Sequence, residues 1–257
     1  MKLQVLGSYG GGAIGFHLSA FLLNEELLLD AGSVISHLSI TEQLKIKGVF
    51  ITHSHFDHIR DLPVLADNFL AGESTKLRVF SIPEVIEALK KHIFNDIIWP
   101  DFTKIPSTNE GILEFIPVYN KKKFNFEGYE ITPIFTKHTV PSTGYLFCKD
   151  GKKLFYSGDT GPNSEPWISL KGIELDALIA EVSFPERMED IAIASMHYTP
   201  SMFFKEVLTL SPPPKNIYVF HLKPSFKEEI SKEIEKLKKH YDVNNIRVLE
   251  NGEVIHI

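Results

Sequence analysis

Cysteine is nearly absent from this chain of 257 residues, and the chain also lacks long apolar runs and an excess of basic side chains. The single cysteine, Cys148, excludes a disulfide within the chain and favours a reducing compartment. No apolar run approaches the roughly 20 residues needed to span a bilayer, and residues 1–7 are too short an apolar run for a signal peptide. We therefore predict a soluble, cytoplasmic protein without membrane contact.

The charge balance argues against a nucleic-acid partner. The chain has 27 Lys and Arg against 33 Asp and Glu, a formal net charge of −6, whereas a long polyanion needs an extended basic surface. The one notable basic run before the C-terminal helix, Lys121-Lys122-Lys123, is predicted to lie in solvent at a hairpin between residues 115–118 and 124–126. A small anionic substrate suits this distribution better than RNA or DNA.

Composition and pattern favour one α/β domain over residues 1–257. Hydrophobic residues make up 43% of the chain, and there is no repeat, low-complexity segment or obvious linker. Strand-like runs dominate residues 3–30, 49–52 and 113–156, whereas helices are expected after Pro83, after Pro200 and over residues 225–241. Periodicity alone leaves several α/β arrangements open.

The most informative feature is the run His53-Ser54-His55-Phe56-Asp57-His58, which places three imidazoles and a carboxylate in six residues. A β-branched and aromatic run, residues 48–52, precedes it and reads as a buried strand, and a helical pattern over residues 62–70 follows it. His and Asp suit zinc, manganese or iron better than calcium, and the lack of a nearby thiolate argues against a structural zinc finger. The run therefore predicts the metal site of a hydrolase.

Further candidate ligands follow later strand-like runs, because hydrolytic zinc sites need more ligands than one loop supplies. His138 follows residues 130–137, Asp159 follows residues 153–158, and His221 follows residues 216–220.

The order of these residues, with Asp159 in Ser-Gly-Asp-Thr, resembles the metallo-β-lactamase superfamily. The resemblance is closer to class II cyclic-nucleotide phosphodiesterases, and it is carried by residues 6–12, 28–32, 92–100, 181–184 and 221–224. Asp61 departs from the pattern, since many members have a small residue there, usually Gly. The resemblance implies an αββα sandwich of two mixed β-sheets flanked by helices, with metals at one edge.

The resemblance also implies a dinuclear site and its reaction. Two divalent ions, most consistent with Zn²⁺ and with Mn²⁺ or Fe as alternatives, would share a hydroxide that attacks a 3′,5′-cyclic nucleotide and yields the 5′-nucleotide. Asp57 and Asp159 belong to the implied catalytic set. The implied ligands are His53, His55 and His138 for one ion, Asp57, His58 and His221 for the other, and Asp159 between them.

His197 is the predicted general acid that protonates the leaving 3′ oxygen. It stands just before the helix expected at Pro200, where Thr199 reads as an N-cap, and a helix entrance suits a phosphate. Glu181 resembles the acidic partner that related phosphodiesterases use to orient such a histidine, and a carboxylate there would raise the imidazole pKa. The alternative is that His197 only satisfies a loop backbone.

Candidate substrate contacts are His197, Thr139, Asn95 and Trp99. Trp99 could stack on a purine, because every base offers a π face, or it could belong to the core. Asn95 could read a base or ribose edge, or it could cap a turn.

Three classes of function are consistent with the sequence. The leading one is hydrolysis of cyclic AMP or cyclic GMP, with the preference between them open. The second is RNA processing like that of ribonuclease Z, although we find no Gly/Pro-rich or basic insertion that would form an arm for tRNA. The third is a non-catalytic nucleotide-binding protein on the same fold, which the complete ligand set disfavours; lactone or thioester hydrolysis is a further alternative. The sequence leaves a homodimer open.

Overall fold

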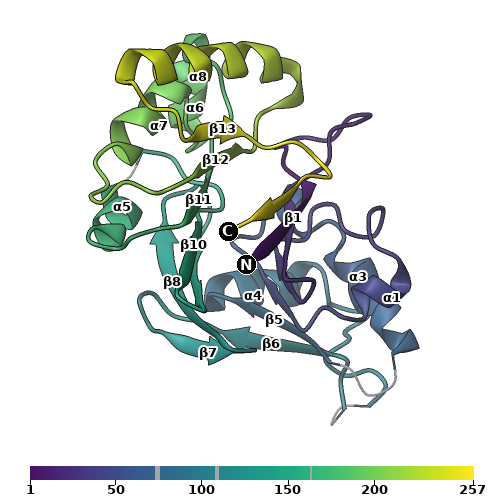
Figure 1. Ribbon diagram of the computed structural model, residues 1–257. Helices are drawn as coiled ribbons and strands as arrows, with labels where there is room; N and C mark the ends of the chain where they lie inside the picture. The colour runs from purple at the N-terminus through teal and green to yellow at the C-terminus, as the bar shows by residue number, and fades with distance from the viewer. Residues whose placement is uncertain (73–75, 108–109, 163) are drawn as a thin grey trace.

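Two seven-stranded mixed β-sheets pack face to face, with helices on their outer sides (Figure 1). The computed structural model describes residues 1–72, 76–107, 110–162 and 164–257. This arrangement confirms the αββα sandwich that the resemblance implied. In spatial order, the first sheet contains β14 (Val254–His256), β1 (Lys2–Gly7), β2 (Ala20–Leu23), β3 (Leu27–Leu29), β4 (Gly48–Phe50), β5 (Leu77–Ser81) and β6 (Leu113–Pro117). The second contains β13 (Ile246–Val248), β12 (Ile217–Phe220), β11 (Ala177–Glu181), β10 (Lys152–Tyr156), β9 (Ser142–Lys149), β8 (Tyr129–Thr136) and β7 (Phe124–Phe126).

The helices divide between the two sheets. Those from the first half of the chain flank the first sheet, and those from the second half cover the outer face of the second sheet (Figure 1). Within the described residues, no helix has the length and apolar content needed to span a membrane. The α-helices are α1 (Ile40–Gln43), α2 (Phe56–Ile59), α3 (Leu62–Asn68), α4 (Pro83–His92), α5 (Ser164–Leu170), α6 (Glu189–Ala194), α7 (Pro200–Val207) and α8 (Lys227–Tyr241). Short 3₁₀ helices are η1 (Phe69–Ala71), η2 (Glu186–Met188) and η3 (Pro224–Phe226).

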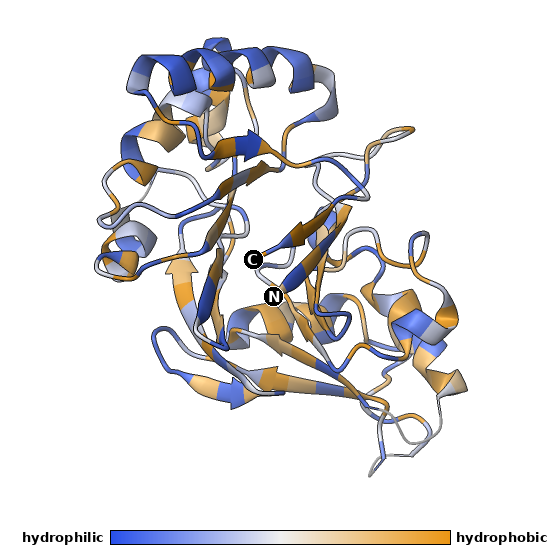
Figure 2. Cartoon of the chain, viewed as in Figure 1, coloured by the Kyte–Doolittle hydropathy of each residue, from blue (hydrophilic) through white to orange (hydrophobic). Residues whose placement is uncertain are grey.

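Aromatic side chains fill the space between the sheets. Phe50 of β4 stacks on Phe80 of β5 with ring centroids 4.7 Å apart. It also meets Tyr145 and Phe147 of β9 edge-on at 5.5 and 5.2 Å. A second apolar cluster packs α5, α7 and α8 onto the other face of the second sheet. The central strands of the second sheet are therefore buried on both sides, which explains their nearly continuous apolar sequences (Figure 2).

The strand directions bring the ends of several strands to one edge. Strands β3, β4, β5 and β6 are parallel in the first sheet, as are β10, β11, β12 and β13 in the second. Strand β8 runs in the same direction as β10, because each pairs antiparallel with β9 between them. Residues that follow β4, β8, β10, β11 and β12 therefore gather at one place.

The structure confirms the predicted helix positions, whereas one predicted strand pairing is wrong. Helices begin at Pro83 and Pro200 as expected, and the C-terminal helix covers Lys227–Tyr241. The helical pattern expected over residues 62–70 is present as α3 and η1, whereas α2, which lies within the histidine run, was not predicted. The predicted hairpin around residues 121–123 is wrong, because β6 belongs to the first sheet and β7 to the second, so this segment crosses between sheets. A two-residue period identifies a strand but not its partner.

Tyr145 provides a hydrogen bond between the sheets that can be tested. Its buried hydroxyl, on the second sheet, lies 2.9 Å from the carbonyl oxygen of Ile51, just after β4, and 3.3 Å from that of Phe80 in β5. We expect Tyr145→Phe to lower the free energy of unfolding by about 1–2 kcal/mol, because one buried hydrogen bond is lost while the ring remains. Urea unfolding measures this loss. The control is Tyr218→Phe, since the Tyr218 hydroxyl makes no hydrogen bond within the described chain; equal losses in both variants would contradict the prediction.

Candidate metal centre

Histidine and aspartate side chains from both sheets meet at the shared edge. His53 follows β4, and α2, which begins three residues later, contributes Asp57 and His58. The second sheet contributes the residues just beyond β8, β10 and β12. The potential ligand atoms form groups in which all lie within 4.8 Å of one another: His53, His55, His138 and Asp159; Asp57, His58 and His221; and Asp159, His197 and His221. The first two groups coincide with the ligand sets that the resemblance implied.

Asp159 lies between the two sets and is almost completely buried. Its Oδ1 is 3.2 Å from His58 Nε2, and its Oδ2 is 3.1 Å from His221 Nε2 and 3.7 Å from His53 Nε2. Burial opposes ionisation of this carboxyl, but the adjacent imidazoles of His221 and His58 outweigh burial and hold the pKa of Asp159 well below its usual range. The position is the one expected of a bridging ligand.

Each of four histidines in the cluster has its outer ring nitrogen held by a partner. With Nδ1 occupied in this way, Nε2 is the atom directed at the cluster. The neutral tautomer with the proton on Nδ1 and a free lone pair on Nε2 is therefore favoured. The Nδ1 contacts are His53 with Thr52 Oγ1 at 3.0 Å, His58 with Asp30 Oδ2 at 2.7 Å, His138 with the Met196 carbonyl oxygen at 3.0 Å, and His221 with Ser183 Oγ at 2.8 Å.

Asp30, for which the sequence analysis predicted no role, contacts the cluster through His58. It is fully buried after β3 and adopts a left-handed backbone conformation with φ of 54°. Its carboxylate contacts His58 directly and accepts hydrogen bonds from the Thr52 hydroxyl and, at 2.6 Å, from the Tyr156 hydroxyl. Burial lowers the pKa of His58, but the carboxylates of Asp159 and Asp30 outweigh it and raise that pKa well above its usual value.

A matching arrangement exists on the second sheet. Glu181 at the end of β11 contacts His197 Nδ1 at 2.8 Å and accepts a hydrogen bond from the Ser183 hydroxyl, also at 2.8 Å. Ser183 in turn holds His221. Each buried carboxylate thus holds one histidine directly and a second through a hydroxyl, as Asp30 does for His58 and, through Thr52, for His53.

His197 lies against the cluster. Its ring stacks on that of His221 at a centroid distance of 5.2 Å and lies 5.0 Å from that of His138. Burial lowers the pKa of His197, but the negative charge of Glu181 outweighs burial and raises it above the ordinary value for histidine. The arrangement can therefore present a protonated imidazole beside the cluster.

The cluster fits a cation. Five side-chain atoms of the described residues are buried without a hydrogen-bond partner, and three of them, His53 Nε2, His58 Nε2 and Asp159 Oδ1, lie in the cluster. Burying unpaired polar atoms is costly unless something satisfies them. Burial and the neighbouring His58 lower the pKa of His53, which favours the neutral form that binds metal. A donor set of nitrogen and oxygen without sulfur suits a divalent ion.

The predicted substrate residues lie in different surroundings. The Thr139 hydroxyl is exposed and lies 3.5 Å from His55 Nε2, at the rim of the cluster. Asn95 caps the turn after α4, where its Oδ1 accepts hydrogen bonds from the backbone amides of Ile97 and Ile98. Trp99 packs against the core between the sheets. Within the described chain no hydrogen bond or ring contact joins Asn95 or Trp99 to the cluster, so their role stays a prediction.

Gly10 and Lys223 lie beside His221. A Cβ atom on Gly10 would lie 2.5 Å from His221 Nδ1, so only glycine fits at this position. The Lys223 ammonium donates a hydrogen bond of 2.6 Å to the Gly10 carbonyl oxygen and lies 5.9 Å from the ring centroid of Phe184, which meets His197 edge-on. A cation therefore lies close to the cluster, contributed by segments far apart in sequence.

Asp61, the departure from the superfamily pattern, supports the loop that follows Asp30. Its carboxylate accepts hydrogen bonds from the backbone amides of Val34 and Ile35 and pairs with Arg60. It belongs to none of the three groups of potential ligand atoms described above.

The sequence matches the family described as the beta-lactamase superfamily domain over residues 27–221. The chain belongs to this superfamily. A 3′,5′-cyclic-nucleotide phosphodiesterase of Aliivibrio fischeri is 26% identical, with 95% of this chain and 87% of that protein covered. Ribonuclease Z of Methanocaldococcus jannaschii is 25% identical, with 68% of this chain and 70% of that protein covered. The predicted resemblance to cyclic-nucleotide phosphodiesterases is confirmed.

Solved structures of the superfamily share the fold at low identity. The crystal structure of unliganded yeast PDE1 superposes with a TM-score of 0.85 at 19% identity, covering 100% of this chain and 99% of that chain. The human short-form tRNase Z superposes with a TM-score of 0.71 at 18% identity, with the same coverage. Both comparisons establish the fold.

The contact between Asp30 and His58 predicts an effect on metal affinity. We expect Asp30→Asn to weaken zinc binding about 10–100-fold, because an outer carboxylate orients a ligating histidine and increases its basicity. Competition with a chromogenic chelator measures the affinity. The matched control is Asp61→Asn, which alters another buried carboxylate that touches no cluster histidine, and there we expect wild-type affinity. Unchanged affinity in a folded Asp30→Asn protein would refute the assignment.

Proposed function

We propose that this protein hydrolyses 3′,5′-cyclic nucleotides to 5′-nucleotides at the cluster. The observation that carries the proposal is the meeting of all seven implied ligands around buried, unpaired donor atoms, beside the His197–Glu181 pair. The name of the Aliivibrio fischeri relative, a 3′,5′-cyclic-nucleotide phosphodiesterase covered over most of its length, supports the choice of substrate.

The proposed ligand division follows the two groups of side chains. Bound divalent ions, in our proposal Zn²⁺ with Mn²⁺ or Fe as alternatives, would supply Lewis acidity and make water nucleophilic near neutral pH. His53, His55 and His138 would hold one ion, Asp57, His58 and His221 the other, and Asp159 both. The outer partners of the histidines would keep this donor set in place before substrate arrives, so little reorganisation is needed during reaction.

His197 is the proposed general acid. Glu181 accepts the hydrogen bond of Nδ1–H, which leaves the proton on Nε2 for the substrate. As the P–O bond to the 3′ oxygen breaks, His197 would give this proton to the leaving oxygen, which becomes the 3′ hydroxyl group. Glu181 acts as a positioning residue, because it orients the imidazole and stabilises its charged form.

The surroundings suit a small anionic substrate. Lys223 adds positive charge beside His197, and Thr139 lies at the rim of the cluster. We retain Asn95 and Trp99 as candidate base or ribose contacts. The formal charge of −6 disfavours a nucleic-acid partner. The proposal places the reaction in the cytoplasm.

Ribonuclease Z-like processing is the second candidate, because relatives with that name also match, the Methanocaldococcus jannaschii protein over 68% of this chain. Cleavage of a precursor tRNA by the metal-loaded protein, without turnover of cyclic nucleotides, would select this alternative.

The primary test is turnover of cyclic AMP and cyclic GMP by purified protein of known metal content. We expect the 5′-nucleotide as product with near two metals per chain, and a loss of at least about 10³-fold in kcat for Asp159→Ala, because both metal positions lose a ligand. The ratio of the two rates gives the preference. Asp61→Asn serves as a buried control with activity near wild type. Metal-loaded protein that cleaves neither nucleotide would exclude the proposed reaction.

The His197–Glu181 pair predicts a change in the pH profile. Glu181 raises the pKa of His197, and a general acid works only while protonated, so kcat should fall as pH rises through that pKa. Glu181→Gln removes the charge and should move this alkaline limb to lower pH. His197→Ala should lose about 10²-fold or more in kcat and lack the limb. Metal content is measured in parallel. A Glu181→Gln profile that superimposes on the wild type would contradict the positioning role.

A further inference from the structure

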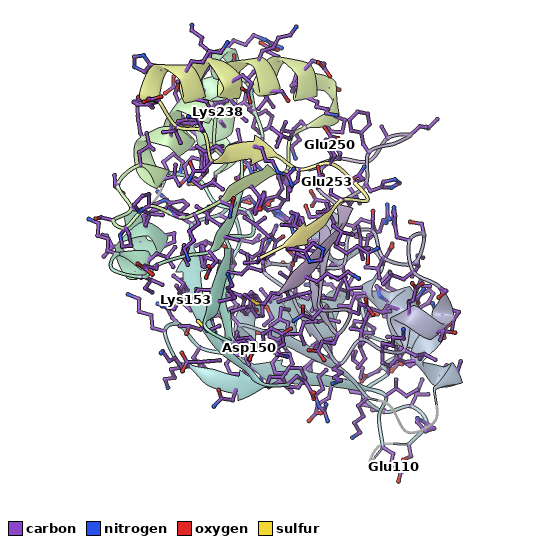
Figure 3. The ribbon with its side chains drawn as sticks, in the orientation of Figure 1. Glu110, Asp150, Lys153, Lys238, Glu250 and Glu253 are labelled. Carbon is purple, nitrogen blue, oxygen red and sulfur yellow. The ribbon has the colours of Figure 1, made fainter. Side chains whose placement is uncertain are left out.

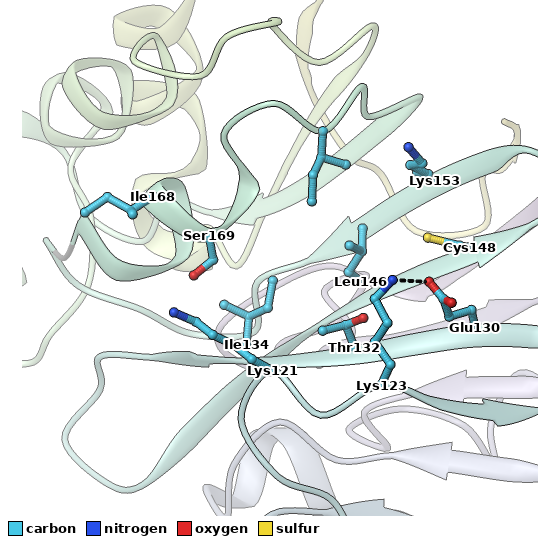
Figure 4. A pocket seen from close by; sticks show the side chains of 11 residues that line it. Lys121, Lys123, Glu130, Thr132, Ile134, Leu146, Cys148, Lys153, Ile168 and Ser169 are labelled. Carbon is cyan, nitrogen blue, oxygen red and sulfur yellow. Dashed lines mark hydrogen bonds and ion pairs between the residues drawn. The ribbon is translucent and has the colours of Figure 1, made fainter.

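A cavity of about 530 Å³ lies on the outer face of the second sheet, beneath α5 (Figure 4). This volume falls within the range of small-molecule sites. Its walls come from β8, β9 and β10, from α5 and the segment after it, and from residues 121–123. None of its lining residues belongs to the histidine and aspartate groups of the metal centre. The cavity is therefore separate from the proposed active site.

The floor of the cavity is built from side chains in register across three strands. Glu130 of β8 lies opposite Cys148 of β9, which lies opposite Lys153 of β10. Two residues further along β8, Thr132 lies opposite Leu146. Alternate residues of a strand share a face, so these rows follow one another on the outer side of the sheet.

The side chains on the outer side of β8, β9 and β10 change from charged to apolar along the strands. At one end lie the charged groups of Glu130 and Lys153, whereas at the other end Ile134 and Leu146 are buried in the outer apolar cluster. Ile168 of α5 and Ile173 complete the apolar end of the lining. The cavity thus has one polar end and one apolar end, as an amphiphilic molecule does.

The polar end is cationic. Lys123 and Lys153 line it, and Glu130, the one acidic residue among the described lining residues, pairs with Lys123 at 2.7 Å. Lys153 makes no ion pair or hydrogen bond through its ammonium within the described chain, and Figure 3 shows it on the outer side of the second sheet. Lys121 lies at the other end of the cavity, beside Ile134 and Ser169, where it pairs with Glu165 of α5 at 2.6 Å (Figure 4). Exposed ion pairs are weak, so an incoming anion can compete for these lysines.

We propose that this cavity binds a small anionic amphiphile, a straight-chain carboxylate whose head lies between Lys123 and Lys153 and whose chain extends beneath α5. Residues 130 and 134 are four positions apart on β8, about 13 Å at the usual rise per residue, and an alkyl chain of about ten carbons has this length. The carboxylate satisfies the excess positive charge, and the chain covers the exposed Ile168 side chain and the partly buried Ile173.

Cys148 provides a direct readout, because it is the one cysteine of the chain and it lines the cavity. The experiment measures the rate at which the folded, metal-loaded protein reacts with a chromogenic disulfide reagent at fixed pH, with and without sodium decanoate. We expect decanoate to slow the reaction at least about fivefold at saturation, since it covers the thiol. Octanoate should bind about tenfold more weakly, because two fewer methylene groups are buried. Decyltrimethylammonium, which has the same chain length and opposite charge, should give no protection.

Two variants locate the site. Lys153→Glu should weaken decanoate binding at least about tenfold in titration calorimetry, because a charge-assisted contact becomes a repulsive one. The matched control is Lys232→Glu, an equal charge change on the exposed side of α8, which should bind as the wild type does. Thr132→Phe should fill the floor and abolish binding without adding charge.

The proposal fails if decanoate leaves the Cys148 rate unchanged, if decyltrimethylammonium protects equally, or if Lys153→Glu binds decanoate as the wild type does. Sedimentation equilibrium adds another outcome. A dimer in which Cys148 is already unreactive would assign this face to a second copy of the chain and overturn the proposal. None of these measurements uses hydrolytic activity, so the result is independent of the proposed reaction.

Discussion

The contact of one buried carboxylate, Asp159, with imidazoles from both sheets is the interaction on which the site depends. His53 and His58 come from the first sheet and its following helix, whereas His221 comes from the second. Such a group of buried polar atoms is unfavourable on its own, and the unpaired Nε2 and Oδ1 atoms show where a cation would offset that cost. The two sheets are therefore joined by polar groups that suit an ion as well as by their apolar core.

The rest of the fold holds this contact in place. Parallel strands deliver their carboxyl ends to one edge, and packing on both faces of the second sheet leaves those ends little freedom. The same pattern of contacts occurs on both sheets. Asp30 on the first sheet and Glu181 on the second each hold one histidine directly and another through a hydroxyl. These outer contacts favour the arrangement in which Nε2 of each histidine faces the cluster, so they contribute to the chemistry that the cluster can support.

The carboxyl edge and the outer face of the second sheet carry different kinds of side chain. The carboxyl edge of this sheet forms half of the candidate metal centre, while its outer face changes from charged to apolar along β8 and β9 beneath α5. Both properties come from the two-residue alternation of strands, which allows one strand to place Ile131 in the core between the sheets and Ile134 in the outer cluster. A ligand on the outer face would therefore contact the strands that lead to His138 and Asp159 without touching either residue.

The sequence by itself determined the features that depend on near neighbours: the histidine run from His53 to His58, the histidine and aspartate residues that follow strands, and helices that begin at Pro83 and Pro200. The resemblance supplied the αββα fold, which periodicity had left open. Only the tertiary structure decided the role of Asp30, the position of Lys223 beside Gly10, and the crossing of residues 121–123 between sheets. The physical reason is that local pattern determines where a strand ends, whereas long-range pairing of the sheets determines which ends meet and which buried carboxylate lies behind each histidine.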